Sequence, residues 1–207
     1  MNNFLVGIDE VGRGPLAGPV TVSALAIPHR LRGSFKDSKK LSATQRKKLL
    51  IWIKSRDDIV FSTASVYPTT IDRINITQAA NLAATRAMKK LLMNQRWHKK
   101  SKIKVLLDGG LYLNSSLLKA KAHNLKATTY VRGDGKYNAI KLASIVAKTK
   151  RDAMMARYHK KYPQYNFNEH KGYGTKRHLS SLKKYGVSKI HRLTFLKNYP
   201  KLIANKL

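Results

Sequence analysis

Short apolar segments alternate with longer helical segments along this chain, and this alternation limits its fold more than any other feature. Five segments have the length and the apolar, partly β-branched composition of strands. Three longer segments are helical by their periodicity, or by the N-cap residue Ser42 that precedes one of them. This order predicts an α/β layered fold in which helices flank a mixed central β-sheet. The predicted strands are residues 4–9, 19–28, 58–67, 103–110 and 127–131, and the predicted helices are residues 43–55, 69–95 and 138–162.

The composition of the chain changes after Pro163. Residues 163–207 are basic, with short helical stretches and interleaved Tyr and His residues. A chain of 207 residues builds one domain, or one domain with a small appendage. We therefore predict an α/β domain over residues 1–162 and a C-terminal helical segment over residues 163–207.

The charge of the chain indicates a polyanionic partner. There are 42 Lys and Arg residues against 10 Asp and Glu residues, and the formal net charge is +32. Nucleic acid is the first candidate partner, and an anionic membrane is the second. The sequence shows no long basic amphipathic helix, no apolar run of about 18 residues and no basic leader typical of a signal peptide. We therefore expect a cytoplasmic monomer that binds nucleic acid and not a membrane.

Acidic residues are scarce, yet two predicted strands end in one. Asp9 ends the first strand, within GIDEVGRGPLAGPV (residues 7–20), and Asp108 ends the strand KVLLD. Functional sites in open α/β sheets gather beyond the carboxyl ends of strands. If these two strands are neighbours, Asp9 and Asp108 face each other. Asp134 lies in a turn before the last long helix and can complete the group.

Glu10 directly follows Asp9, and neighbouring side chains on a regular strand point to opposite faces of the sheet. The two carboxylates can converge only if the strand ends or bulges at this point. The glycine-rich turn that follows favours such an end. We therefore predict that the first strand breaks at Glu10.

Converging carboxylates in a chain without Cys suit a hard cation, either Mg²⁺ or Mn²⁺. Without a metal ion the carboxylates would repel and raise one another's pKa. With two metal ions, such a cluster catalyses in-line phosphodiester hydrolysis. The alternative is that each acid only caps a helix or pairs with one of the many bases, which is the usual role of a single surface acid. Three acids at apolar strand ends favour the metal site.

The turn GRGPLAG is not a dinucleotide-binding motif, because its glycine spacing is one residue too long and a predicted strand follows it. Gly12 and Gly14 can instead let a nucleic-acid backbone approach the main chain, with Arg13 on a phosphate. An ordinary tight turn is the alternative. Tyr173 lies between two glycines among basic residues and can stack on a sugar or a base. A half-buried packing role is its alternative.

These segments resemble the sequence motifs of the type 2 ribonucleases H, the ribonuclease HII family. The first block, GIDEVGRGPLAGPV, is similar to the family's N-terminal motif almost letter for letter. The other blocks follow in the family's order and span nearly the whole chain. They are DSKKLS (37–42), IDRINI (71–76), LLDGG (106–110), ASIVAKTKRD (143–152), GYGT (172–175) and HRLTF (191–195).

The resemblance implies a ribonuclease H-like fold, with a catalytic domain over residues 1–162 and a substrate-binding helical segment over residues 163–207. It implies an endonuclease that cleaves RNA paired with DNA and incises 5′ to a ribonucleotide embedded in duplex DNA. The products would carry 3′-hydroxyl and 5′-phosphate ends. Such an enzyme removes misincorporated ribonucleotides and RNA primers, and it uses Mn²⁺ or Mg²⁺.

The resemblance also implies roles for individual residues. The family's metal-binding, catalytic carboxylates correspond to Asp9, Glu10, Asp108 and Asp134. Its substrate-binding residues correspond to Gly12, Arg13 and Gly14 at the ribonucleotide, Tyr173 at the neighbouring deoxyribose, and Lys39 and Lys40 at phosphates.

Two other functions remain open at this point. The composition alone favours a non-catalytic basic nucleic-acid-binding protein, such as a ribosome-associated factor. A nuclease of the same fold that cleaves DNA junctions is the second alternative. Metal-dependent release of product from an RNA–DNA hybrid separates the first from a ribonuclease, and cleavage of an all-DNA junction would favour the second.

Overall fold

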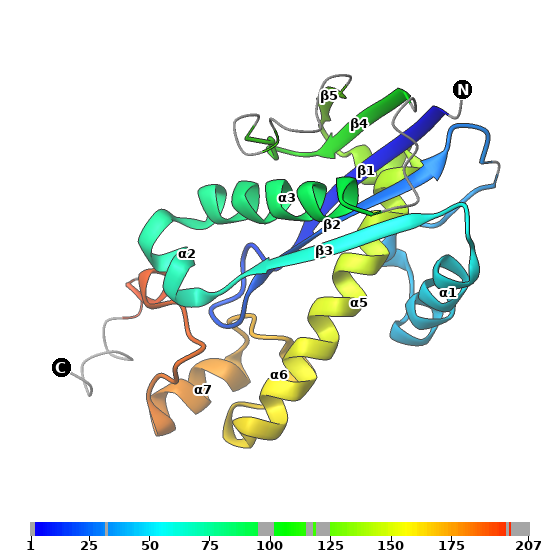
Figure 1. Ribbon diagram of the computed structural model, residues 1–207. Helices are drawn as coiled ribbons and strands as arrows, with labels where there is room; N and C mark the ends of the chain where they lie inside the picture. The colour runs from blue at the N-terminus through cyan, green and yellow to red at the C-terminus, as the bar shows by residue number, and fades with distance from the viewer. Residues whose placement is uncertain are drawn as a thin grey trace.

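A mixed five-stranded sheet forms the centre of the part of the chain that the structure describes (Figure 1). The structure is a computed structural model, and it describes residues 3–31, 33–94, 102–114, 118, 125–197 and 199. The strand order across the sheet is β3-β2-β1-β4-β5. The strands are β1 (Asn3–Val11), β2 (Val20–Pro28), β3 (Val60–Val66), β4 (Lys102–Asp108) and β5 (Leu125–Tyr130).

The sheet combines both pairing directions, as the sequence predicted. Strand β1 pairs antiparallel with β2, and β2 pairs antiparallel with β3. Strand β4 lies parallel to β1 on its other side, and β5 continues the parallel half. All five predicted strands are confirmed, with boundaries moved by a few residues. Because β1 and β4 are parallel neighbours, their carboxyl ends lie at the same edge of the sheet.

Helices cover both faces of the sheet (Figure 1). Helix α3 packs on β2 and β3, and α5 packs on the opposite face across β1 and β2. Helix α1 lies beside α5. The helices are α1 (Ala43–Ser55), α2 (Pro68–Ile74), α3 (Ile76–Leu92), α4 (Gly133–Lys136), α5 (Asn138–Lys161), α6 (Phe167–His170) and α7 (Lys176–Tyr185). Short 3₁₀ helices span Ser38–Lys40, Pro163–Tyr165 and Leu193–Leu196.

Side chains along β1 point alternately to the two faces of the sheet, and the core therefore has two layers. Val6 and Ile8 are fully buried in the layer under α3. Gly7 points the other way, toward α5, and an added Cβ there would lie 2.1 Å from the carbonyl carbon of Ala139. The backbone of α5 therefore rests directly on β1 at this point. This contact fixes the helix close to the end of the strand that carries the acidic pair.

The predicted N-cap of α1 is confirmed. The hydroxyl of Ser42 accepts a hydrogen bond from the Gln45 amide at 3.1 Å. The side chain of Gln45 accepts one in return from the Ser42 amide at 2.8 Å. This reciprocal capping box satisfies two amides that the first helical turn leaves without partners.

The single helix predicted over residues 69–95 is wrong. The structure has two helices there, α2 and α3, which meet at Asn75. Asn75 has a φ of 64°, and its side chain accepts hydrogen bonds from the amides of Thr77 and Gln78, both at 3.0 Å. The apolar spacing runs on across this break because both helices turn apolar residues to the same core layer. Periodicity alone therefore could not reveal it, and residue 95 lies outside the described residues.

The C-terminal segment packs against the turn between β1 and β2 and against the end of α5 (Figure 1). Leu16, Met155 and Phe167 belong to one buried cluster that joins these three parts. The predicted division after residue 162 stays a prediction, because this cluster crosses it. No helix within the described ranges is long and apolar enough to cross a membrane.

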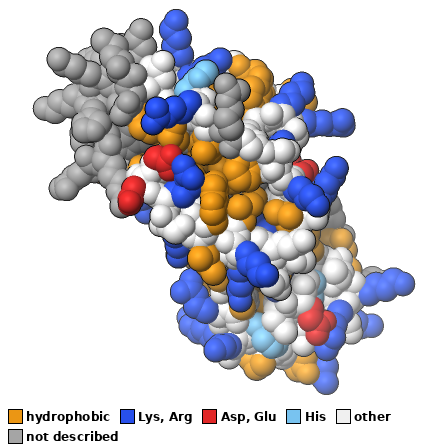
Figure 2. All heavy atoms as spheres, turned by 90° about the vertical axis from the view of Figure 1, so that its right-hand side faces the viewer, with side chains coloured by type: hydrophobic (Ala, Val, Ile, Leu, Met, Phe, Trp, Pro, Cys, Tyr) orange, Lys and Arg blue, Asp and Glu red, His pale blue; other side chains and the backbone are white. Residues whose placement is uncertain are grey.

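Basic side chains are spread over the surface. Figure 2 shows one face of the molecule, on which Lys and Arg side chains surround a central hydrophobic area and outnumber the acidic side chains. The positive charge is therefore dispersed over this face rather than gathered into one block.

Candidate active site

The ends of β1 and β4 bring two acids together. Ile8 of β1 lies opposite Leu107 of β4, so the next residues along the two parallel strands, Asp9 and Asp108, lie side by side. The sequence left the adjacency of these two strands as a condition, and the structure meets it. Strand β4 ends at Asp108, where Gly109 takes a φ of 56° and the chain turns away.

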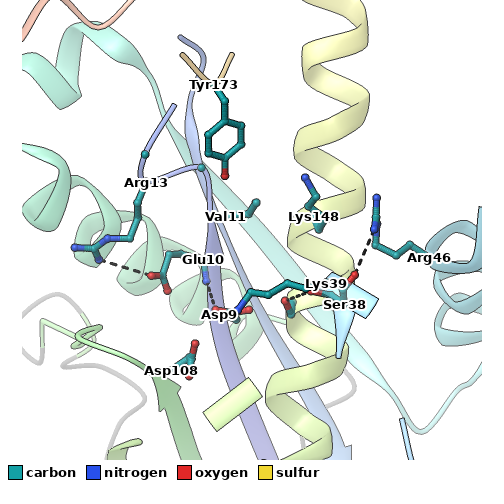
Figure 3. A pocket seen from close by; sticks show the side chains of 13 residues that line it. Asp9, Glu10, Val11, Arg13, Ser38, Lys39, Arg46, Asp108, Lys148 and Tyr173 are labelled. Carbon is teal, nitrogen blue, oxygen red and sulfur yellow. Dashed lines mark hydrogen bonds and ion pairs between the residues drawn. The ribbon is translucent and has the colours of Figure 1, made fainter. Parts of the chain in front are cut away.

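The predicted break of the first strand at Glu10 is wrong. Glu10 pairs with Val22 in regular antiparallel register, and β1 continues through the next residue. The carboxylates share one pocket for a different reason. The neighbouring strand β4 ends at Asp108, so the edge of β1 beyond that point is open. Side chains from both faces reach this open edge, with Asp9 on the α5 side and Glu10 on the α3 side (Figure 3).

A pocket of about 500 Å³ lies at this edge (Figure 3). Most of the residues predicted from the sequence line it. These are Asp9, Glu10, Gly12, Arg13, Gly14, Lys39, Asp108 and Tyr173. Two predicted residues do not line it: Lys40 is exposed on the 3₁₀ helix, and Asp134 lies behind Lys39.

Asp9 is a buried carboxyl group that other acids crowd. Burial raises its pKa well above the ordinary value, and the charges of Glu10 and Asp108 raise it further. Hydrogen bonds from the Ser144 hydroxyl and from the Glu10 amide, the latter at 2.8 Å, act in the opposite direction. The raised pKa means that the ionised form of Asp9 lacks sufficient positive charge beside it.

The ionised form of Glu10 also lacks sufficient positive charge beside it. Burial raises its pKa, the nearby Arg13 lowers it, and Asp108 raises it again. The Arg13 guanidinium lies 3.7 Å from one carboxylate oxygen of Glu10. The other oxygen, Oε2, is buried and has no hydrogen-bond partner among the described residues. A buried carboxylate oxygen without a donor is costly, and a bound cation would relieve that cost.

Asp108 and Asp134 are linked through the backbone. Asp108 accepts hydrogen bonds from the amides of Gly133 at 2.6 Å and Asp134 at 3.4 Å, which ties α4 to the end of β4. The Asp134 carboxylate is buried and accepts a hydrogen bond from Lys39 Nζ at 2.7 Å. This bond raises the pKa of Lys39, so its ammonium group stays charged. Asp134 thus reaches the pocket only through its neighbours.

The residues fit a divalent cation by their chemistry. Asp9, Glu10 and Asp108 offer desolvated carboxylate oxygens, the ligands that Mg²⁺ and Mn²⁺ prefer. Within the described ranges, however, no three acidic or histidine side chains are gathered closely enough to hold an ion without moving. A cation in this pocket would therefore draw the carboxylates together against their mutual repulsion.

The two glycines of the turn after β1 serve different purposes. Gly12 has a φ of 88°, and an added Cβ would lie 2.2 Å from Nε of Arg151. A glycine is therefore needed here because the protein interior has no room for a side chain. Gly14 has only the Tyr173 ring near its Cβ direction, at 3.8 Å. Only Gly14 therefore leaves room on the pocket side. Between them, Arg13 directs its guanidinium to Glu10 (Figure 3). The guanidinium also donates a hydrogen bond to the Thr77 hydroxyl at 3.2 Å.

Tyr173 is available to a ligand. The residue is 43% exposed, which argues against a packing role for the ring. The preceding Gly172 has a φ of 88° and accepts a hydrogen bond from the Leu16 amide at 2.8 Å. This bond joins the tyrosine loop to the glycine turn, so Tyr173 and Gly14 are held on one wall of the pocket.

Four polar residues that line the pocket were not predicted from the sequence: Ser38, Arg46, Ser144 and Lys148. Arg46 and Lys148 lie together at one end of the pocket (Figure 3). Both bond to the Asp152 carboxylate, at 3.4 Å and 3.0 Å, which holds the two cations there. A signal for two of these positions, Ser144 and Lys148, and for their partner Asp152 was present. Ser144, Lys148 and Asp152 are spaced by four residues, which places them on one face of a helix.

Comparison with known proteins identifies the family of this chain. The sequence matches the family Ribonuclease HII over residues 6–198. It is 39% identical over 198 residues to a ribonuclease HII of Ruminiclostridium cellulolyticum, an alignment that covers 95% of this chain and 71% of that protein.

Solved structures share the fold. The ribonuclease H2 of Pyrococcus horikoshii superposes with a TM-score of 0.76 at 25% identity, covering 98% of both chains. The structure of Bst-RNase HIII in complex with Mn²⁺ also has a TM-score of 0.76, at 17% identity, covering 99% of this chain and 70% of that one. The predicted ribonuclease H-like fold is therefore confirmed. The chain belongs to the ribonuclease HII family, whose members are endoribonucleases that act on RNA–DNA hybrids.

Proposed function

We propose that this endoribonuclease incises duplex DNA on the 5′ side of an embedded ribonucleotide, and that it also cuts the RNA strand of longer hybrids. The products would carry 3′-hydroxyl and 5′-phosphate ends. One observation supports this proposal most: the acids at the ends of β1 and β4 and the glycine turn line the same pocket. A phosphate beside the acids would therefore place its own sugar against the turn. The cellular role that follows is removal of misincorporated ribonucleotides and RNA primers.

We propose that Asp9, Glu10 and Asp108 hold divalent metal, with Asp134 as a fourth ligand. Enzymes of this family depend on such a metal, and the Mn²⁺ complex of Bst-RNase HIII makes Mn²⁺ a candidate beside Mg²⁺. When bound, two such ions supply an activated water and stabilise the leaving oxygen. The buried Oε2 atom of Glu10, which lacks a donor among the described residues, supports this assignment.

Lys39 would change partner when substrate binds. In the structure, the ammonium group of Lys39 is hydrogen-bonded to the Asp134 carboxylate, although 77% of the lysine side chain is exposed. A phosphate in the pocket offers Lys39 another anion. Release of Lys39 would free Asp134 to turn toward Asp108, whose carboxylate already accepts a hydrogen bond from the Asp134 amide.

The remaining cations would hold the nucleic-acid backbone. Arg46 and Lys148 line the pocket, and Asp152 fixes both of them. A shared carboxylate restrains long side chains, so less freedom is lost when they bind a phosphate. The exposed Lys40 would bind a phosphate outside the pocket.

Family membership removes the non-catalytic alternative, because the relatives are ribonucleases. Cleavage of an all-DNA junction remains an outcome that an assay can detect. The substrates proposed here occur where DNA is present. The cytoplasmic location and the monomeric state both remain predictions.

The test is cleavage of an end-labelled duplex that carries one ribonucleotide, with Mn²⁺ or Mg²⁺ added. The enzyme should cut once, 5′ to the ribonucleotide, and leave a 3′ end that a DNA polymerase can extend. The double variant Asp9→Asn with Asp108→Asn should lower kcat by about a thousandfold or more, because the charge that holds the metal is lost.

Asp57→Asn is the matched control, since Asp57 is exposed and does not line the pocket. It removes a carboxylate of the same type and should keep wild-type cleavage. Near wild-type activity of the double variant would contradict the proposed metal site. Cleavage of an all-DNA junction, with none at the ribonucleotide, would contradict the proposed substrate.

A further inference from the structure

Two arginines outside the pocket are fully buried, Arg151 and Arg192. Neither forms an ion pair with an acid among the described residues. Burial lowers the pKa of Arg151 to about 10 and that of Arg192 to about 9. A buried guanidinium without a carboxylate partner is costly. Its donors must therefore be satisfied in another way, and here backbone carbonyls accept them.

Arg192 holds the glycine turn through hydrogen bonds to backbone carbonyls. Its Nη2 donates to the Gly12 carbonyl at 2.7 Å, and its Nη1 donates to the Arg13 carbonyl at 2.8 Å. Its Nε donates to the Gly18 carbonyl at 2.9 Å. One rigid, planar group therefore fixes two consecutive peptide units of the turn and ties them to the start of β2.

The orientation of these two carbonyls decides where the neighbouring amides point. In a trans peptide unit, the C=O and the N–H point in opposite directions. The Gly12 and Arg13 carbonyls point to Arg192, so the amides of Arg13 and Gly14 point away from it. Both residues line the pocket. Within the described part of the chain, neither amide has a hydrogen-bond partner.

We propose that Arg192 is a positioning residue for ribose recognition, which presents the amides of Arg13 and Gly14 to the 2′-hydroxyl of the ribonucleotide. This inference rests on the proposed function. The oxygen of a 2′-hydroxyl accepts hydrogen bonds, and a deoxyribose lacks that acceptor. Two fixed amides in the pocket can therefore distinguish the sugars. A flexible turn would lose this distinction, because its amides would lack a fixed direction.

Arg151 provides a matched comparison. It is equally buried and also donates only to carbonyls, those of Pro19 at 2.9 Å, Ala17 at 3.1 Å and Lys171 at 3.0 Å. It supports the tyrosine loop and the end of the turn, but it contacts neither carbonyl that Arg192 holds. A substitution of Arg151 therefore imposes a similar loss of buried hydrogen bonds without releasing the two amides.

The experiment compares Arg192→Lys with Arg151→Lys, both in an Asp9→Asn background that blocks cleavage. Fluorescence anisotropy measures binding to two duplexes of one sequence that differ in a single 2′-hydroxyl. Arg192→Lys should reduce the preference for the ribonucleotide duplex by about tenfold, the effect of losing one well-placed hydrogen bond. Its affinity for the all-DNA duplex should stay unchanged. Arg151→Lys should keep the wild-type preference.

An unchanged preference in Arg192→Lys would overturn the proposal. An equal loss of affinity for both duplexes would also overturn it, because the amides would then bind a phosphate and not the sugar. If Arg192→Lys fails to fold in a thermal melt, the neutral Arg192→Gln replaces it and keeps an amide donor. Hydrogen–deuterium exchange on the Asp9→Asn enzyme needs no change at Arg192. The ribonucleotide duplex should protect the amides of Arg13 and Gly14 more than the all-DNA duplex does.

The unsubstituted enzyme separates the two ways of failing. If it does not cut the duplex at the single ribonucleotide, the proposed function is wrong. If it cuts there while Arg192→Lys retains the full preference for ribose, only the role of Arg192 is wrong.

Discussion

At the scale of single residues, the site combines groups that destabilise one another. Asp9 and Glu10 are buried next to each other, and each has a raised pKa because burial and neighbouring acids oppose its charge. Such a pair has a stability cost that the protein retains for function. The cost should therefore be measurable, and metal should reduce it.

Glu10→Gln should stabilise the metal-free protein. The substitution removes a buried charge and supplies a donor near Asp108, so we expect a gain of about 1 kcal/mol, or a few degrees in Tm. The same change should abolish most of the cleavage activity. Thermal melts with and without Mn²⁺ check this, since metal should stabilise the wild type more than the variant. A lower Tm for metal-free Glu10→Gln would contradict the prediction. Glu169→Gln, at an exposed ion pair with Arg177, is the control.

Gly12→Ala should reduce the stability of the protein, whereas Gly14→Ala should reduce its activity. At Gly12 the φ of 88° and the contact with Arg151 leave no room for a methyl group, so we expect a loss of at least about 2 kcal/mol of stability. Gly14→Ala should keep its Tm but lose activity at a single ribonucleotide, because the methyl group lies on the pocket side beside Tyr173. Chemical denaturation and cleavage assays separate the two effects. Equal losses of stability would contradict the distinction.

At the scale of elements, the start of α7 is connected to the tyrosine loop through buried histidines. The Ser188 amide donates to Nδ1 of His191 at 2.8 Å, and the facing Nε2 atoms of His191 and His178 are 3.1 Å apart. Nδ1 of His178 lies 2.9 Å from the Tyr173 carbonyl, to which it donates. Both rings are then neutral, with one proton each. This chain of hydrogen bonds holds the backbone of Tyr173 in place.

Acid should destabilise this segment. Burial, with a smaller contribution from the stacked His170, lowers the pKa of His178 from the ordinary value of 6.5 to about 4. The unfolded chain then binds more protons between these two values, so stability is complete above about pH 6.5 and declines toward pH 4. We expect this group to account for a loss of about 2 kcal/mol at pH 5.

Urea denaturation at several pH values measures this effect. His178→Gln should flatten the decline between pH 6.5 and pH 4, although it lowers stability at neutral pH. His29→Gln, at an exposed histidine, should leave the pH profile unchanged. An unchanged slope in the His178 variant would show that other groups cause the acid sensitivity.

At the scale of the whole molecule, the net charge of +32 determines how the protein meets a duplex. The basic side chains are dispersed on the face that Figure 2 shows, so they add affinity for any phosphate backbone without selecting a sequence. Under the proposed function, discrimination between substrates belongs to the pocket, where the amides and Tyr173 lie. Affinity and specificity should therefore respond differently to salt.

Raising the salt concentration from 50 to 200 mM should weaken binding to an all-DNA duplex by about a thousandfold, because several phosphate contacts release counterions. The preference for a duplex with one ribonucleotide should change little, because the 2′-hydroxyl is uncharged. Anisotropy titrations of both duplexes at each salt concentration check this. A preference that falls together with the affinity would indicate that the basic side chains on the surface, and not the pocket, distinguish the substrates.

Local patterns were sufficient for much of this architecture. The strands, the long helix α5 and the Ser42 cap followed from periodicity and from residue types at the ends of elements. The break at Asn75 did not, because a positive φ at one residue does not disturb the apolar spacing on either side. Residue types at strand ends also singled out Asp9 and Asp108, but only the parallel pairing of β1 with β4 in the structure brings them together.

By itself, the sequence determined the α/β elements, the scarce acids at strand ends and the family motifs that imply a ribonuclease. Only the tertiary structure decided how Glu10 joins its neighbours, through the early end of β4 and not through a break in β1. It also decided the support of the glycine turn, where Arg192 contacts a carbonyl 180 residues away in the chain. The physical reason is the same in both cases. Local periodicity specifies which face a residue takes, whereas strand register and packing specify which distant groups meet there.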